Sequence, residues 1–176
     1  LLNAVEEGNF ESCLCFRQAV CDEPKTPETL RLKTAVEITK CLCRILMELH
    51  STDNKAQAIV HRDIKPSNII ISDDGEVYLL DINVAKWSDP EEIEDTRLYG
   101  TLYYAAPEQL GYGFSASSEK SDIYALGILM NYMITGKLPK EEKAEEPIWT
   151  IIKKCISYEP EERYTAGELL AVLEEI

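Results

Sequence analysis

The chain has 176 residues, 45% of them hydrophobic, which suits one globular domain with a sizeable core and excludes a fibrous or disordered chain. Its 18 basic and 32 acidic residues give a net charge of −14, which repels phosphate backbones and anionic lipids, so neither nucleic acid nor membrane is expected as a partner. No secretory signal opens the chain and its longest apolar run, 123–134, is too short to cross a bilayer, so a cytoplasmic location is expected.

The first half of the chain predicts helices followed by short strands. A short helix is expected around 10–20, and a long one over 30–50, where apolar residues recur at helical spacing behind Thr26 and Pro27 as capping residues. β-Branched segments at 58–60, 68–71 and 77–81 predict strands. The sequence Ser-Asp-Asp-Gly at 72–75 predicts a hairpin turn between the last two.

The second half predicts a long loop and then helices. Residues 84–104 show no period and predict a loop without regular structure. A buried helix is expected at 122–134, an acidic connector at 140–147, a helix near 148–156, and a last helix that begins with a capping box of Thr165 and Glu168. The fold class is therefore predicted as mainly α (α+β): a single domain, 1–176, built as a helical bundle with a small β-hairpin.

Six cysteines lie mostly in apolar, helix-like segments, which favours reduced thiols over disulfides. Two cysteine doublets also allow a metal hypothesis, but residues two apart on a helix point about 200° apart and make a poor chelate. The cysteines are Cys13, Cys15, Cys21, Cys41, Cys43 and Cys155.

The segment HRDIKPSN, residues 61–68, places an acid, a lysine and an amide in one loop between the long helix and the hairpin. Asp63 is followed by Lys65 and Asn68, and Asp81 comes directly after the hairpin. This pattern resembles the catalytic loop H-R-D-x-x-x-x-N of the protein kinase family and its metal-binding aspartate.

Further matches follow in the family's order. Ala106-Pro107-Glu108 resembles its A-P-E triplet, and Thr101, after Gly100, stands where a substrate-facing threonine is expected. The segment 121–127, SDIYALG, resembles its D-x-x-x-x-G helix and makes Asp122 a structural residue, while Arg163 resembles the arginine that pairs with the glutamate of A-P-E. Lys65-Pro66 and the sequence GTLYYAAPE resemble serine/threonine rather than tyrosine kinases.

The resemblance implies a kinase C-terminal lobe with its catalytic loop at 61–68 and its activation segment at 81–108. Asp63 would accept or orient the proton of the attacking hydroxyl, and Lys65 would face the phosphoryl oxygens of ATP. Asn68 and Asp81 would bind Mg²⁺ beside the nucleotide. The implied cofactors are ATP and Mg²⁺, and the implied partner is a protein substrate.

The resemblance also implies that Arg62 pairs with a phosphorylated residue of the activation segment. Arg62 resembles the arginine that, in many kinases, grips a phosphorylated loop residue through charge-assisted hydrogen bonds. Thr96 and Tyr99 are the candidates for this phosphorylated residue, and Thr96 is taken as the regulatory site.

The chain also departs from the family pattern. The D-F-G triplet reads Asp81-Ile82-Asn83, and asparagine is the residue that best replaces glycine at positive φ. Neither a glycine-rich loop nor a V-A-I-K lysine precedes residue 61, so the N-terminal lobe is expected to come from a parent chain, and this chain alone is expected to be inactive. The segment before Arg163 is short, which predicts a reduced or missing substrate-docking helix.

Two other functions remain open. One is a pseudokinase or scaffold that binds a partner through its acidic surface. The other is a small-molecule phosphotransferase of kinase-like fold, although such enzymes do not resemble this chain in its A-P-E triplet or in Lys65-Pro66.

Overall fold

The computed structural model describes residues 28–51, 58–87, 101–112 and 116–176. It is mainly helical, as predicted, and contains the helices α3 (Glu28–His50), α4 (Glu119–Thr135), α5 (Ile148–Cys155) and α6 (Ala166–Glu174). The strands are β1 (Ile59–Val60), β2 (Ile69–Ile71), β3 (Val77–Leu79) and β4 (Lys86–Trp87), and short 3₁₀ turns lie at Pro66–Asn68, Pro107–Leu110 and Pro160–Glu162. The helix expected at 10–20 and the capping residue Thr26 lie outside the described residues.

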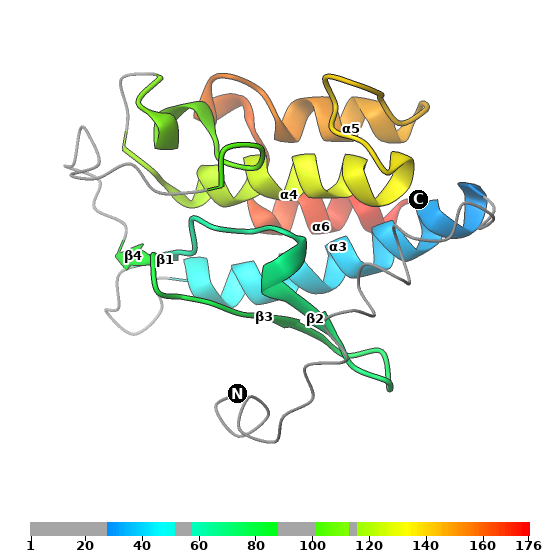
Figure 1. Cartoon of the computed structure of the whole chain (residues 1–176), viewed down its shortest axis with the longest axis horizontal. Helices are drawn as coiled ribbons and strands as arrows, with labels where there is room; N and C mark the ends of the chain where they lie inside the picture. Colours follow the sequence, from blue (N-terminus) through cyan, green and yellow to red (C-terminus); the bar gives the residue numbers. More distant parts are fainter. Residues whose placement is uncertain (1–27, 52–57, 88–100, 113–115) are drawn as a thin grey trace.

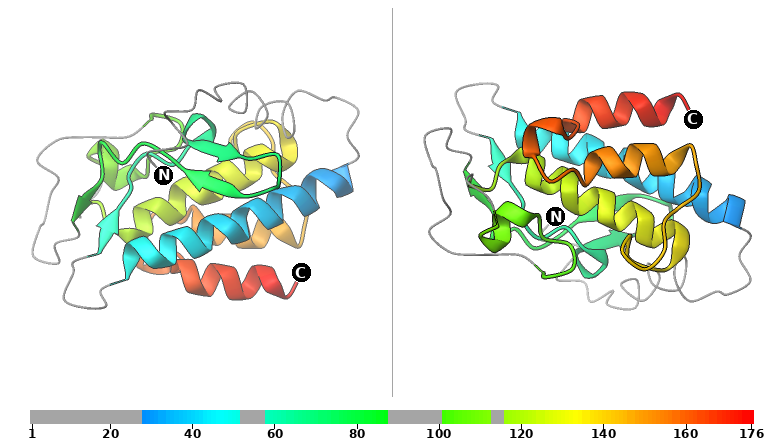
Figure 2. Two further views of the ribbon diagram at one scale, coloured as in Figure 1. Left: turned by 90° about the horizontal axis from the view of Figure 1, so that it is seen from below. Right: turned by 90° about the horizontal axis from the view of Figure 1, so that it is seen from above.

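The core lies between the helices. Helix α3 packs against α4 and α6, and α4 packs against α5 (Figures 1 and 2). Burying aliphatic side chains between these helices is the main favourable contribution to folding, at about 25 cal/mol per Å² of apolar surface. Fully buried side chains at the centre are Leu42, Leu46, Leu126, Leu129, Met130, Ile152, Leu169 and Leu173.

Helix α4 is buried on nearly all sides, which confirms the buried helix predicted at 122–134. Ser118 begins the helix as its N-cap, and Gly136 ends it in the left-handed region at φ 76°. Gly127 lets α4 approach the chain at the end of α5 closely, because a Cβ at this position would lie 2.6 Å from Cβ of Cys155. This close approach fixes α4, which carries residues of the candidate site.

The β2–β3 hairpin confirms the turn predicted at 72–75. Ile69 pairs with Leu79 and Ile71 with Val77, and Gly75 has the positive φ of 86° that the turn requires. The hairpin and α5 lie on opposite sides of the α3–α4 pair (Figures 1 and 2). The loop 61–68 enters this hairpin directly.

Strand β4 corrects the prediction that 84–104 lacks regular structure. Val60 pairs with Lys86 and Ile59 with Trp87 in a second antiparallel sheet. Two-residue strands carry no detectable alternation, and their pairing depends on a partner far away in sequence. The short sheet ties the chain after Asp81 back to the entry of the loop 61–68.

The remaining helix predictions agree with the structure. Helix α6 begins with the predicted capping box, in which Glu168 N donates to Thr165 Oγ1 and Thr165 N donates to the Glu168 carboxylate.

Residues 136–147, all of them described, contain no helix between α4 and α5. This agrees with the prediction of a reduced docking helix. In the described part of the chain, no helix combines the length and apolar character needed to cross a membrane.

The described cysteines are free thiols. Cys41 is half-buried, whereas Cys43 and Cys155 are buried in the helical core. Burial raises the pKa of the Cys43 thiol to about 12, so this group stays protonated at neutral pH. Among the residues the structure describes, no cluster of three histidine, cysteine or acidic side chains could hold a metal ion.

Candidate active site

The loop 61–68 gathers its polar side chains around the carboxylate of Asp63. Lys65 Nζ lies 2.6 Å from Asp63 Oδ2, and Asn68 Nδ2 donates to the same oxygen at 3.1 Å. Asn68 Nδ2 also donates to the Asp63 carbonyl at 2.8 Å, which closes the loop on itself. The 3₁₀ turn Pro66–Asn68 sets this spacing, because Pro66 begins it with a preset φ.

Thr101 joins this cluster from a distant part of the chain. Its Oγ1 donates to Asp63 Oδ1 at 2.8 Å and accepts from Lys65 Nζ at 2.9 Å. The structure therefore brings Asp63, Lys65, Asn68 and Thr101 together, and one carboxylate receives hydrogen bonds from the other three residues.

These contacts set the charge of Asp63. Burial raises the pKa of its carboxyl, but hydrogen bonds from Lys65, Thr101 and Asn68, together with the charge of Lys65, outweigh burial and hold the pKa below its usual value. Asp63 is therefore a carboxylate at neutral pH. A charged, half-buried carboxylate beside a lysine can accept or orient a proton from a nearby hydroxyl.

The backbone of the loop is anchored to helix α4 through Asp122. This buried carboxylate accepts from His61 N and Arg62 N, both at 2.8 Å, and from His50 Nε2 at 2.9 Å. Gln109 Nε2 donates to the Arg62 carbonyl at 2.8 Å. The polar backbone groups at the start of the loop are thus paired inside the protein, which holds Arg62 at its positive φ of 68°.

The side chain of Arg62 contacts the segment that follows the hairpin. Its Nε donates to the Val84 carbonyl at 2.6 Å, and the residue is only 9% exposed. The predicted phosphorylated partners Thr96 and Tyr99 lie outside the described residues. The regulatory role of Arg62 therefore stays a prediction.

Asp81 follows Leu80, whose backbone is hydrogen-bonded to Asn68 at the end of the hairpin. Leu80 N donates to the Asn68 carbonyl at 2.8 Å, and His61 Nε2 lies 3.0 Å from the Leu80 carbonyl. The Asp81 carboxylate is exposed, and its backbone has a positive φ of 65°. Leu80 thus makes the hydrogen bond to Asn68, and Asp81 is the next residue in the chain.

The donor atoms of Asn68 and Asp81 fit Mg²⁺. The amide nitrogen of Asn68 makes that side chain's hydrogen bonds, which leaves its oxygen for a cation. Asp81 offers an exposed carboxylate. Mg²⁺ prefers such oxygen ligands and takes one or two protein groups when phosphates and waters complete its octahedron.

Asn83 differs from the role expected of it. The positive φ of this segment is at Asp81, whereas Asn83 is not among the described residues with positive φ. Instead, Asn83 Nδ2 donates to Asp81 Oδ1 at 2.6 Å. Where the kinase pattern it resembles has glycine, this chain thus has a side chain that holds the candidate metal ligand.

We expect Asn83→Gly to weaken metal binding. Loss of the Asn83–Asp81 hydrogen bond frees the Asp81 carboxylate to rotate, and one such bond corresponds to roughly a two- to tenfold change in the dissociation constant. Titration of Mn²⁺, followed by electron paramagnetic resonance in the presence of ATP, measures this change. The matched control is Ile82→Gly, which adds a glycine to the same turn without removing the bond. Equal affinities for Asn83→Gly and the wild type would contradict the role.

A buried ion pair braces the segment that ends at Glu108. Arg163 Nη1 and Nη2 donate to the two oxygens of Glu108 at 2.7 and 3.0 Å, and Ser121 Oγ donates to Glu108 Oε1 at 2.7 Å. The guanidinium also lies 5.0 Å from the ring centre of Tyr124 on α4. This bidentate pair joins the segment after Thr101 to the helical core.

Most of the sequence matches one known protein family. The family model described as "Protein kinase domain" matches residues 15–172. The chain belongs to the protein kinase family.

The kinase-family relatives include bacterial and plant proteins. The chain is similar to serine/threonine-protein kinase A of Synechocystis, with 38% identity over 62% of this chain and 22% of the relative. It is also similar to serine/threonine-protein kinase PrkC of Bacillus subtilis, with 31% identity over 79% of this chain and 24% of the relative. Mitogen-activated protein kinase kinase 1 of Arabidopsis thaliana is 28% identical over 83% of this chain and 46% of the relative. The chain thus spans less than half the length of these relatives.

Sequence reasoning missed several residues that position the candidate site. Gln109 and Ser121 act through contacts with Arg62 and Glu108 that carry no local signal in the sequence. His50 could be placed only at the end of a helix, yet it contacts Asp122 from the end of α3. The closeness of Asn83 to Asp81 in sequence was the one available signal, since asparagine side chains often bond two residues away in turns.

Proposed function

We propose that this chain is the C-terminal, catalytic lobe of a serine/threonine protein kinase that transfers the γ-phosphoryl group of ATP to a protein hydroxyl. The observation that carries the proposal is the cluster of Lys65, Asn68 and Thr101 around the Asp63 carboxylate. The serine/threonine class is supported by the names of the bacterial relatives and by Lys65-Pro66.

Each residue has a distinct role in this reaction. Asp63 orients the acceptor hydroxyl and takes its proton while the hydroxyl oxygen bonds to the γ-phosphorus and the bond to ADP breaks. Lys65 lies 2.6 Å from Asp63 and places its charge beside the transferred oxygens. Asn68 and Asp81 would hold Mg²⁺, which supplies positive charge to the phosphates.

We further propose that the nucleotide needs a second wall from a kinase N-terminal lobe. The residues of the cluster supply the acceptor side of the reaction, and the family's glycine-rich loop and its strand lysine belong to the other lobe. The isolated 176-residue chain should therefore bind ATP weakly. It should phosphorylate a generic serine peptide at least about 100-fold more slowly than a fusion that joins the chain to a kinase N-terminal lobe.

The measurement is incorporation of labelled γ-phosphate into the peptide and into the chain itself, with both proteins at equal concentration. Stoichiometric phosphorylation by the chain alone would overturn the dependence on a second lobe. A fusion that binds ATP but transfers no phosphate to any acceptor would instead favour a scaffold. Transfer to an aminoglycoside or choline but not to the peptide would favour a small-molecule phosphotransferase.

A further inference from the structure

Gln109 is a buried amide in the 3₁₀ turn Pro107–Leu110, and it contacts the loop 61–68. The residue is 1% exposed. Its Nε2 donates to the Arg62 carbonyl at 2.8 Å, and its Oε1 accepts from Ala106 N at 3.0 Å. Glutamine is seldom fully buried, and a buried amide costs free energy unless both of its ends are paired. Here both ends are paired with backbone groups from two different segments.

The first of these hydrogen bonds fixes the peptide bond that leads into Asp63. The Arg62 carbonyl and Asp63 N belong to one planar unit, so the direction of the carbonyl also sets the direction in which the chain enters Asp63. Arg62 has a positive φ of 68°, a conformation that costs free energy in residues other than glycine. Asp122 on α4 accepts from Arg62 N at 2.8 Å, and Gln109 donates to the carbonyl of the same residue. The strained residue is therefore held on both sides, and loss of the Gln109 amide frees the side nearer Asp63.

The second hydrogen bond holds the end of the segment 101–106. Ala106 N donates to the Gln109 side chain, and Gln109 N donates back to the Ala106 carbonyl at 3.0 Å. At the start of the segment, Thr101 Oγ1 donates to Asp63 Oδ1 at 2.8 Å. Polar contacts thus hold both ends of this segment, and both lead back to Asp63, one directly and one through the peptide bond before it.

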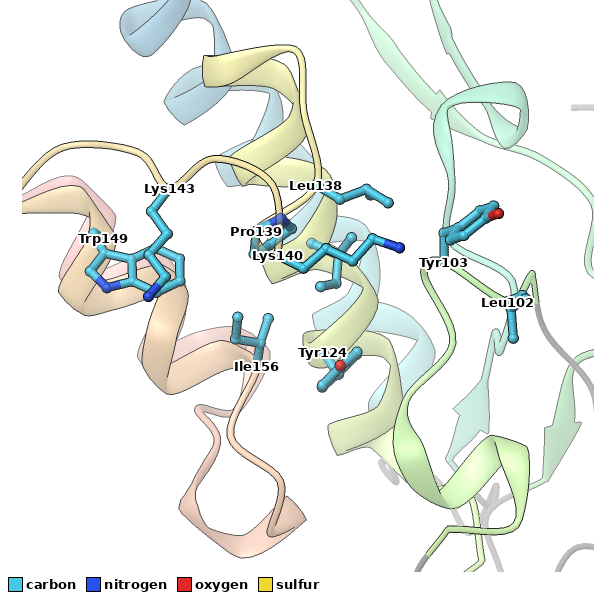
Figure 3. A pocket seen from close by; sticks show the side chains of 10 residues that line it. Leu102, Tyr103, Tyr124, Leu138, Pro139, Lys140, Lys143, Trp149 and Ile156 are labelled. Carbon is cyan, nitrogen blue, oxygen red and sulfur yellow. The ribbon is translucent and has the colours of Figure 1, made fainter.

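Packing does little for the first half of this segment. Leu102 and Tyr103 are 67% and 57% exposed, and they border a cavity of about 370 Å³. Tyr124 of α4 and Trp149 of α5 line the same cavity, as Figure 3 shows. Apolar side chains that leave the space beside them unfilled gain little from van der Waals contact. The segment therefore keeps its position through the hydrogen bonds at its ends rather than through close packing of these two side chains.

From these observations we propose that Gln109 is a positioning residue for phosphoryl transfer, because one side chain bonded to both partners aligns the Asp63 carboxylate with the segment 101–106. The inference rests on the proposed kinase function and adds to it a residue that acts through Arg62 and Asp63 rather than on the substrate, the nucleotide or the metal ion. A shift of the segment is transmitted to Asp63 through the same side chain, so the two sides of the acceptor site move together.

Gln109→Met tests this role, because methionine has nearly the same shape but can form neither hydrogen bond. In the fusion with a kinase N-terminal lobe, turnover of a serine peptide should fall roughly 10²-fold, the loss that a misplacement of about 1 Å can cause. The Michaelis constant for ATP should stay at the wild-type value, since the change displaces the acceptor side only. Steady-state phosphorylation measures both constants.

Asn131→Leu is the matched control. Asn131 is also a fully buried amide, and it pairs with backbone groups of the connector 137–144 near the C-terminal end of α4. Leucine removes these hydrogen bonds at nearly constant shape, so the variant should lose stability in urea unfolding, as Gln109→Met does, but keep wild-type turnover.

Gln109→Asn is a milder change at the same position. It retains the amide but shortens the side chain by one methylene, so the amide cannot reach both partners, and turnover should lie between those of the wild type and Gln109→Met. Wild-type turnover in both variants of Gln109, or equal losses of turnover in Gln109→Met and Asn131→Leu, would overturn the inference.

A readout without catalysis uses the isolated 176-residue chain. Near neutral pH, the backbone and carboxyl NMR signals of Asp63 should shift in Gln109→Met and keep their wild-type positions in Asn131→Leu, because only the first change frees the peptide bond before Asp63. Amide hydrogen exchange at Ala106 should be faster in Gln109→Met, since its acceptor is gone. Unshifted Asp63 signals in Gln109→Met would contradict the positioning role.

The outcomes separate this inference from the proposed function. If the Asp63 signals shift in Gln109→Met but the wild-type fusion transfers phosphate to no acceptor, the positioning of Asp63 by Gln109 stands and the kinase function fails. If the fusion phosphorylates the peptide and its Gln109→Met variant does so equally fast, the kinase function stands and the positioning role fails.

Discussion

Asp63→Asn should lower the turnover number of the lobe fusion by roughly 10²- to 10⁴-fold, the range for loss of a positioned acid–base group. Asparagine has the same shape and can still accept from Thr101 Oγ1, but it cannot take a proton and no longer balances the charge of Lys65, 2.6 Å away. The Michaelis constant for ATP should change little, because in the proposed reaction Asp63 faces the acceptor hydroxyl rather than the nucleotide. Steady-state phosphorylation of a serine peptide measures both constants.

Asp73→Asn is the matched control, because Asp73 is exposed in the turn of the β2–β3 hairpin. It removes the same charge and should leave turnover unchanged. An Asp63→Asn fusion that keeps more than about a tenth of the wild-type turnover would exclude Asp63 as the group that handles the proton.

The pH dependence should follow from the lowered pKa of Asp63. Because its folded-state pKa lies below the ordinary value of 3.8, the charged form is favoured by the fold. The contribution to stability is complete above the unfolded-state pKa and is lost as the pH falls through the lower folded-state pKa. Asp63 therefore limits neither activity nor folding near neutral pH.

Arg163→Met should destabilise the fold by about 3–5 kcal/mol, the usual loss when one partner of a buried ion pair is removed. Glu108 is 5% exposed, and methionine would leave its carboxylate buried beside only the Ser121 hydroxyl. The backbone carbonyls of Lys120, Ser157 and Tyr158 would lose their guanidinium donors as well. Urea unfolding followed by circular dichroism measures the change, with an unchanged slope showing that the two-state transition is preserved.

Arg163→Met/Glu108→Leu tests the cause of the loss. If an uncompensated buried charge is responsible, removing Glu108 as well should recover part of the stability. Lys137→Met is the control, because Lys137 pairs with Glu142 at the surface, where an ion pair contributes about 1 kcal/mol or less. Similar small losses for Lys137→Met and Arg163→Met would contradict the bracing role of the buried pair.

The helical part of the fold could be predicted from the sequence because its signals are local. The long run of helical spacing before His50 gave α3, and the capping box of Thr165 and Glu168 gave the start of α6. Gly75 marked the hairpin turn. Strand β4 was missed because Lys86 and Trp87 form a strand only through pairing with Val60 and Ile59.

In the candidate site, too, the local features could be predicted from the sequence and the tertiary ones could not. The spacing of Asp63, Lys65 and Asn68 is a local pattern, and the structure brings these side chains together. The positive φ of Asp81 could not be predicted from the sequence. It accompanies contacts across the hairpin and the hydrogen bond from the Asn83 side chain. The cavity between Tyr103, Tyr124 and Trp149 could not be predicted either, since it forms between segments that only the tertiary fold brings side by side.

The anchoring of the loop 61–68 to Asp122 has a consequence for which substitutions the protein can accept. Its carboxylate accepts backbone N–H groups of His61 and Arg62, so an amide in its place would turn a donor toward another donor. Ile82, by contrast, is 67% exposed in the segment that follows the β2–β3 hairpin. Substitutions are therefore expected at Ile82 itself, whereas its neighbours Asp81 and Asn83 and the anchoring residue Asp122 are expected to be retained.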